Sequence, residues 1–161
     1  RLPMKFLEVQ RPAPWVYIIM ALAVGLGWWT FVQQILLGRP FGQNPAPDWG
    51  VWLLWAVLGL VVPLVMLRFR LEVSVDEREI VVRFAPVWTR RVARDEVESC
   101  EARSYRPIWD YGGWGIRYGG KIRGWAYTVR GSQGAFLILR DGKRLLIGSE
   151  DPRQLVRAIV G

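Results

Sequence analysis

Residues 15–37 read WVYIIMALAVGLGWWTFVQQILL and contain no charged side chain. Residues 49–67, WGVWLLWAVLGLVVPLVML, are likewise without charge. At a rise of 1.5 Å per residue, helices of these lengths measure about 34 Å and about 28 Å, close to the roughly 30 Å thickness of the hydrocarbon core of a bilayer. The two segments therefore predict two membrane-spanning helices.

Three alternative interpretations account for these segments less well. A cleaved signal peptide has a shorter apolar core and a small-residue cleavage site, and a second apolar segment does not normally follow it so closely. A buried helical hairpin of a soluble protein needs a larger surrounding shell than the remaining 94 residues, 68–161, can provide. A re-entrant helix is a further alternative for the shorter segment.

The charges around the two segments predict their orientation. Only 11 residues, 38–48, connect them, so the helices should form an antiparallel hairpin with both chain ends on one side. The chain before residue 15 carries three cationic residues and the chain after the second segment opens with Arg68 and Arg70, whereas the loop carries only Arg39. By the positive-inside rule both termini should be cytoplasmic. The chain starts with Arg1 rather than Met, so we expect a natural N-terminal piece to precede it.

The interior of the predicted spans indicates an anchor. No Asp, Glu, Lys or Arg lies within either span, which argues against an ion pathway or a transport site. Two small-residue pairs, Ala21 with Gly25 and Ala23 with Gly27, would let another helix approach closely. That helix could be the second span or a helix of a partner.

After residue 67 the chain carries 18 Lys and Arg against 12 Asp and Glu, and its apolar residues alternate with polar ones. Alternation with a period of two is typical of strands that are buried on one face. A short C-terminal helix should follow, because Asp151 and Pro152 are typical of a helix start. We therefore divide the chain into an N-terminal cytoplasmic segment (1–14), a transmembrane hairpin (15–67) and a cytoplasmic domain (68–161). About seven strands are expected in that domain, drawn from segments 71–75, 80–84, 89–93, 97–105, 114–118, 125–129, 135–139 and 144–147.

Three runs of sequence carry a resemblance to a known group of proteins. Residues 106–117 read RPIWDYGGWGIR, residues 127–131 read YTVRG and residues 141–149 read DGKRLLIGS. Together they resemble a signature of uncharacterised bacterial membrane proteins that pair two membrane helices with a C-terminal bacterial PH-like domain. The resemblance covers most of the chain from about Trp15 onward. It implies a membrane α-helical hairpin plus a mainly-β PH-like barrel with one C-terminal helix, placed in the bacterial cytoplasmic membrane.

The residue types offer little support for catalysis. The chain contains no histidine and a single cysteine, Cys100, which excludes a disulfide framework within the chain and a cysteine-based zinc site. The glycine-rich stretch 112–124 lacks the Gly-Lys-Ser/Thr ending of a P-loop. We predict no catalytic, cofactor-binding or metal-ligating residue, no enzymatic activity, no small-molecule substrate and no nucleic-acid binding.

Two sets of side chains are candidate contacts for larger partners. The glycine-rich stretch and its aromatic residues could serve the packing of the domain, or they could form an exposed surface for a protein partner. The basic residues could form a solvated face, or they could attract the anionic headgroups of the adjacent leaflet. The candidate protein contacts are Trp109, Tyr111, Trp114 and Arg117, and the candidate lipid contacts are Arg68, Arg70, Arg90, Arg91 and Arg94.

These features lead to two hypotheses of function. The first is a non-catalytic accessory or scaffold subunit that docks on a larger integral membrane protein complex. Related bacterial PH-like domains occur in factors that assemble photosynthetic complexes, so the resemblance suggests an energy-transducing or photosynthetic complex. The second hypothesis is a membrane-surface sensor or module that binds anionic lipid headgroups through the PH-like domain.

Overall fold

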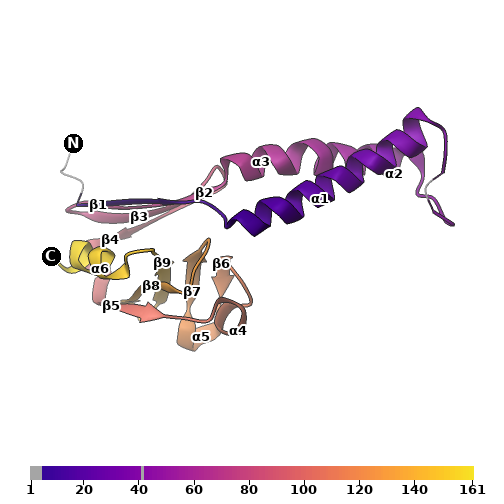
Figure 1. Ribbon diagram of the computed structural model, residues 1–161. Coiled ribbons are helices and arrows are strands. Elements are labelled where there is room, and N and C mark those ends of the chain that lie inside the picture. Colours follow the sequence, from indigo (N-terminus) through magenta and orange to yellow (C-terminus); the bar gives the residue numbers. More distant parts are fainter. Residues whose placement is uncertain (1–4, 41) are drawn as a thin grey trace. The chain divides into compact units, whose positions relative to one another are not determined.

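The computed structural model describes residues 5–40 and 42–161, in two compact units (Figure 1). One unit comprises residues 13–69 and is helical. The other combines the chain before residue 13 with residues 70–161 and is mainly β. The first four residues of the predicted N-terminal segment lie outside the described residues.

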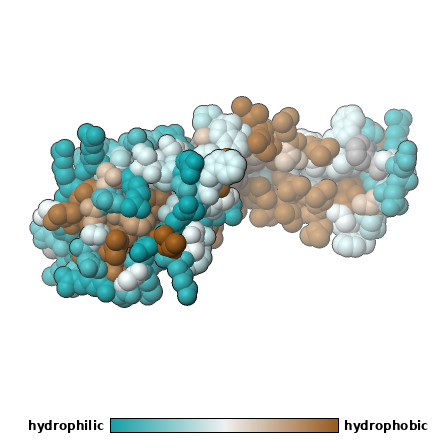
Figure 2. Space-filling model, turned by 90° about the horizontal axis from the view of Figure 1, so that it is seen from below, coloured by the Kyte–Doolittle hydropathy of each residue, from teal (hydrophilic) through white to brown (hydrophobic). Residues whose placement is uncertain are grey.

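Two long helical stretches make up the helical unit. The first consists of α1 (Pro14–Phe31) and a π-helical continuation, η1 (Val32–Leu36). The second consists of α2 (Asp48–Leu54), the π-helical η2 (Trp55–Val61) and α3 (Val62–Arg68). They contain 23 and 21 residues and are long and apolar enough to cross a membrane. Figure 2 shows apolar side chains along this unit and a mostly hydrophilic surface on the β unit.

An aromatic cluster joins the two helical stretches. Trp55 lies between Phe31, whose ring stacks on it with centroids 4.6 Å apart, and Trp28, which meets it edge-on at 5.3 Å. Trp52 meets Phe31 edge-on at 4.8 Å. Gly59 lies against this cluster, since a Cβ atom added there would be 3.2 Å from Trp55 Cδ1 and 3.3 Å from Trp28 Nε1. Aromatic stacking over a close backbone approach therefore holds the hairpin together.

We predict that Gly59→Leu weakens the hairpin by about 1–3 kcal/mol, because its side chain needs the space that the two indole rings fill. Gly25→Leu is the matched control, since nothing lies within 4 Å of a Cβ atom added at that exposed position. Thermal unfolding of the purified chain in detergent measures the difference. Equal melting temperatures for the two variants would contradict the packing described here.

The first sheet contains four antiparallel strands in the order β1-β2-β3-β4. They are β1 (Phe6–Gln10), β2 (Arg70–Val75), β3 (Glu79–Ala85) and β4 (Trp88–Ala93). Strand β1 lies in the N-terminal segment, for which the sequence predicted no strand. It pairs with β2, although the whole helical unit separates the two strands in the sequence. Its exposed Leu7 and Val9 alternate with buried Phe6 and half-buried Glu8.

The second sheet contains five strands in the order β5-β8-β9-β7-β6, with β7 and β9 parallel. Its strands are β5 (Val97–Ser104), β6 (Gly115–Tyr118), β7 (Trp125–Thr128), β8 (Gln133–Leu139) and β9 (Arg144–Gly148). The helical elements of this unit are η3 (Arg94–Glu96), α4 (Pro107–Tyr111), α5 (Gly120–Arg123) and the C-terminal α6 (Pro152–Val160).

The eight segments predicted as strands coincide with β2 to β9, but the prediction that they close into a barrel of about seven strands is wrong for the described residues. They form nine strands in two sheets, and no ladder of hydrogen bonds joins the sheets into a barrel. Alternation of apolar residues predicts where a strand runs, but it does not identify the strand with which it pairs. The coarser prediction of a mainly-β domain with one C-terminal helix is confirmed.

The core of the β unit includes buried residues from both sheets and from α6. Strand β9 is buried on both of its faces, since Leu145, Leu146 and Ile147 are all almost inaccessible. A second cluster, Tyr105, Ala126, Phe136 and Leu146, covers one face of the second sheet. The largest fully buried side chains of the unit are Tyr127, Phe84, Leu71, Ile80, Leu137, Leu145, Leu146, Ile147 and Leu155.

Candidate functional site

The short helices α4 and α5 are bound to each other. Helix α4 has Pro107 in its first turn and ends at Gly112, whose φ of 72° lies in the left-handed region that favours glycine. The Asp110 carboxylate lies 3.3 Å from the Arg123 guanidinium of α5, and the Tyr111 hydroxyl donates to the Arg123 carbonyl at 3.3 Å. These contacts fix the two helices as one surface element.

This element exposes large apolar side chains. Trp109 is 79% exposed and Ile122 is 78% exposed, and Ile108 is also largely exposed. The basic residues Lys121 and Arg123 lie on the same helix as Ile122. We name Ile108, Trp109 and Ile122, with the basic residues of α5, the α4–α5 surface.

The structure separates the four predicted protein contacts. Trp109 is largely exposed, which for this residue favours the exposed-surface alternative over packing of the domain. Tyr111 is half-buried and meets Tyr105 edge-on at 6.1 Å. Trp114 is half-buried and donates from Nε1 to the Gly131 carbonyl at 2.9 Å. Arg117 is exposed and donates to the Trp114 carbonyl at 3.2 Å.

Sequence reasoning missed Ile108 and Ile122. The signal that could have found them is a bulky aliphatic residue on each side of the Gly112–Gly120 region and outside any strand pattern. Ile122 also lies between two basic residues, Lys121 and Arg123. An apolar residue in such a place has no regular face of a sheet or helix to join, which favours exposure.

Two glycines of the glycine-rich stretch are explained by close packing. A Cβ atom at Gly119 would lie 2.9 Å from Tyr111 Cε1 and 2.8 Å from Arg123 Cβ. Gly124 has a φ of 71°, and a Cβ atom there would lie 2.1 Å from the Arg144 carbonyl oxygen. The packing interpretation of this stretch accounts for both residues.

Most of the predicted lipid contacts have partners within the protein. The Arg94 guanidinium donates to the Ile159 carbonyl at 2.6 Å, near the end of α6, where a helix leaves its last carbonyls without helical partners. Arg68 is the last residue of α3. The other contacts are Arg70 with Glu72 at 2.5 Å, Arg90 with the Tyr127 hydroxyl at 2.7 Å and Arg91 with Glu79 at 3.4 Å.

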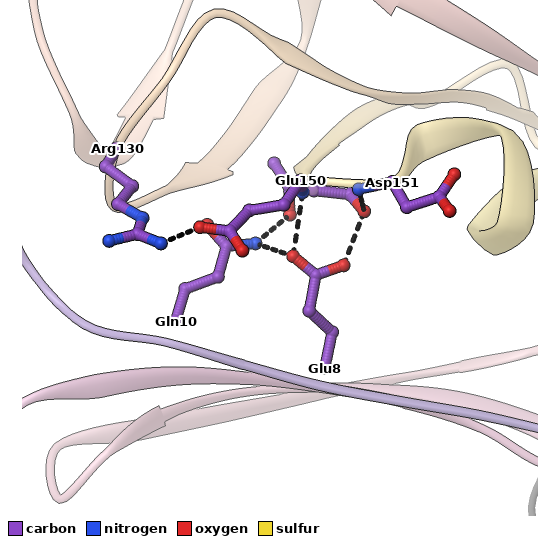
Figure 3. Close-up of polar contacts among 7 residues, drawn as sticks. Glu8, Gln10, Arg130, Glu150 and Asp151 are labelled. Carbon is purple, nitrogen blue, oxygen red and sulfur yellow. Dashed lines mark hydrogen bonds and ion pairs between the residues drawn. The ribbon is translucent and has the colours of Figure 1, made fainter.

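A polar network joins β1 to the segment between β9 and α6 (Figure 3). The Glu8 carboxylate accepts hydrogen bonds from the Ser149 hydroxyl at 2.5 Å, the Glu150 backbone N–H at 2.8 Å and the Gln10 amide at 2.6 Å. The Gln10 amide also donates to the Gly148 carbonyl at 2.9 Å. We name these contacts the Glu8 clamp.

The Glu8 clamp connects parts of the chain that lie about 140 residues apart. Arg130 pairs with the Glu150 carboxylate beside the clamp, as Figure 3 shows. The clamp leads directly into α6, whose first turn is capped by the Asp151 carboxylate accepting from Gln154 N–H at 3.0 Å, as the sequence predicted. Its contacts fasten the first strand to the end of the chain.

Burial raises the pKa of the Glu8 carboxyl above its ordinary value of 4.5, although the hydrogen bonds from Ser149 and Gln10 act in the opposite direction. The folded protein therefore holds a proton on Glu8 at pH values where the unfolded chain has released it. The free energy of unfolding should fall as the pH rises from about 4.5 through the raised pKa.

Urea unfolding of the purified chain across this pH range measures the effect. Glu8→Gln is the control, because it keeps the shape of the side chain without a titrating group, and it should lack this part of the pH dependence. The same pH dependence in both proteins would show that Glu8 does not titrate as described.

The only cysteine should react slowly with alkylating reagents. Burial raises the pKa of the half-buried Cys100 thiol to about 12, and the neighbouring Glu101 carboxylate acts in the same direction. Near pH 8 the reactive thiolate should be about a thousandfold scarcer than in an ordinary cysteine. Alkylation followed by mass spectrometry, before and after unfolding, checks this, and equal rates in both states would contradict it.

The described residues contain no group of three or more Cys, Asp or Glu residues placed to hold a metal ion. A family model described as a family of unknown function, DUF6141, matches residues 2–161. No curated protein matches the chain.

Proposed function

Since the chain belongs to the family of unknown function DUF6141, we propose that it is a non-catalytic, membrane-anchored accessory subunit that docks on a larger membrane protein complex. The two long apolar helices would be the anchor. The β unit would be the docking domain, and the α4–α5 surface its contact with the partner.

The connections between the two units support a docking role. Only residues 11–13 separate β1 from α1, and only Phe69 separates α3 from β2. A domain tied at two points by such short connections cannot search far from its anchor, because each residue extends at most about 3.6 Å. Its partner must therefore lie at the same membrane surface.

The observation that carries the proposal is the exposure of Trp109 and Ile122 on α4 and α5. Tryptophan and arginine are enriched among the residues that dominate binding energy at protein interfaces. In the isolated chain, both side chains keep nearly four-fifths of their surface in contact with solvent. Covering them would remove that apolar surface from water, which favours binding.

The proposal extends to the setting of the protein. Cationic residues flank the hairpin on the side of both chain ends, which supports a cytoplasmic placement of the β unit. The three sequence runs that resemble bacterial PH-like membrane proteins support a bacterial cytoplasmic membrane, a PH-like relationship of the domain and a partner among energy-transducing or photosynthetic complexes.

We predict that the double variant Trp109→Ala/Ile122→Ser loses its partner. Truncating two side chains at the centre of an interface should weaken binding by at least about tenfold. The measurement is co-purification of the tagged full chain from its native membranes in mild detergent, with the partner identified and quantified by mass spectrometry. Val160→Ser, at an exposed apolar position on α6, is the control and should retain the partner.

Undiminished recovery of the same partner with the double variant would overturn the assignment of the α4–α5 surface. A wild-type chain that purifies as a solitary species would overturn the accessory role itself.

A further inference from the structure

A second apolar surface lies on β6 and β7, where one face remains partly exposed. Ile116 pairs with Tyr127 and Tyr118 pairs with Trp125, and paired side chains in an antiparallel ladder lie on the same face. The Trp88 ring of β4 stacks on Tyr127, with centroids 5.1 Å apart and planes 10° apart. Trp88 therefore extends the face of β6 and β7 toward the first sheet.

We name Trp88, Ile116, Tyr118 and Trp125 the aromatic strip. Each of these side chains is between 36% and 55% exposed, and Val87, next to Trp88, is 70% exposed. The strip rests on a rigid base, because Tyr127 beneath it is buried and its hydroxyl accepts from Arg90 at 2.7 Å. Side chains held in this way lose little conformational freedom on binding.

The register of the first sheet places the β3–β4 turn at the end of the sheet where the chain enters the helical unit. Arg70 pairs with Ala85, the last residue of β3, and Arg70 lies two positions after Arg68, the last residue of α3. The turn that leads to Val87 and Trp88 thus begins beside the position of the sheet at which the chain returns from the helices.

In Figure 1, β6 and β7 lie toward the same end of the β unit as the end of β1 and the start of β2, whereas α6 lies toward the opposite end. The contacts agree with this placement, because β6 pairs with β7, whose Tyr127 supports Trp88 beside the β3–β4 turn. The aromatic strip and the chain's entry into the helices share one end of the unit.

We infer that the aromatic strip is a lipid-binding surface that lies in the anionic headgroup layer. The inference rests on the anchoring role proposed for the helices but not on a protein partner. Tryptophan and tyrosine prefer the headgroup region, where the ring meets apolar chains and its N–H or O–H meets water. Arg90 alternates onto the same face of β4 as Trp88 and donates to the Tyr127 hydroxyl, and strands β4, β6 and β7 carry no acidic residue, which suits an anionic lipid surface.

Lipid-borne quenchers test this inference in the full chain. Cys100 is replaced by Ser, and single cysteines are introduced as Val87→Cys, Tyr118→Cys or Glu77→Cys and labelled with a fluorophore. Each protein is reconstituted into phosphatidylcholine vesicles with phosphatidylglycerol and with headgroup-region nitroxide lipids. Glu77 is the control, because it lies in the exposed turn after β2, at the other end of the strand from Arg70.

We expect quenching at positions 87 and 118 to be several-fold stronger than at 77, and to weaken when phosphatidylglycerol is omitted or the salt concentration is raised. Quenching at position 118 no stronger than at position 77 would overturn the inference, even if position 87 is quenched. The aromatic strip would then be assigned to a protein partner instead of lipid. Recovery of a partner by co-purification is a separate result, so this inference and the proposed function can fail independently.

Discussion

The pairing of β1 with β2 is the interaction on which the rest of the structure depends. The two strands lie on either side of the helical unit in sequence, and their ladder runs from Phe6 opposite Val75 to Gln10 opposite Leu71. Because Gln10 at the end of β1 pairs with Leu71 near the start of β2, the chain leaves the β unit and returns to it at neighbouring positions of one sheet. The two connections to the helices therefore start about one strand spacing, roughly 5 Å, apart.

The Glu8 clamp depends on the same pairing. Because β1 is held at the edge of the first sheet, Glu8 and Gln10 can reach the backbone between β9 and α6. The first strand and the last helix of the unit are thereby fastened through one half-buried carboxylate. A β unit that began at residue 70 would lack both the edge strand and the acceptor for Ser149 and Glu150, so the segment before the hairpin is part of the domain.

The long apolar segments were predictable from sequence, because a run of about 20 apolar residues without charge permits few other structures. Most strands were also predictable, as was the capped start of α6 at Asp151 and Pro152. Strand β1 was not, because five residues with one alternation carry a weak signal and their partners lie 61 to 69 residues away in the sequence. The α4–α5 surface was only half predictable: Trp109 was identified, but its neighbours Tyr111 and Trp114 have inward contacts that depend on the fold of distant strands.

The position of β1 ahead of the hairpin also has a consequence for how the protein is made. During synthesis β1 emerges before both apolar segments, yet β2, the strand that it needs, is complete only after both segments have left the ribosome. The first sheet can therefore form only after both apolar segments have been synthesised, because its β1–β2 ladder joins residues on either side of them. A chain interrupted before β2 leaves β1 without its partner, an unpaired strand of the kind that can pair with other chains.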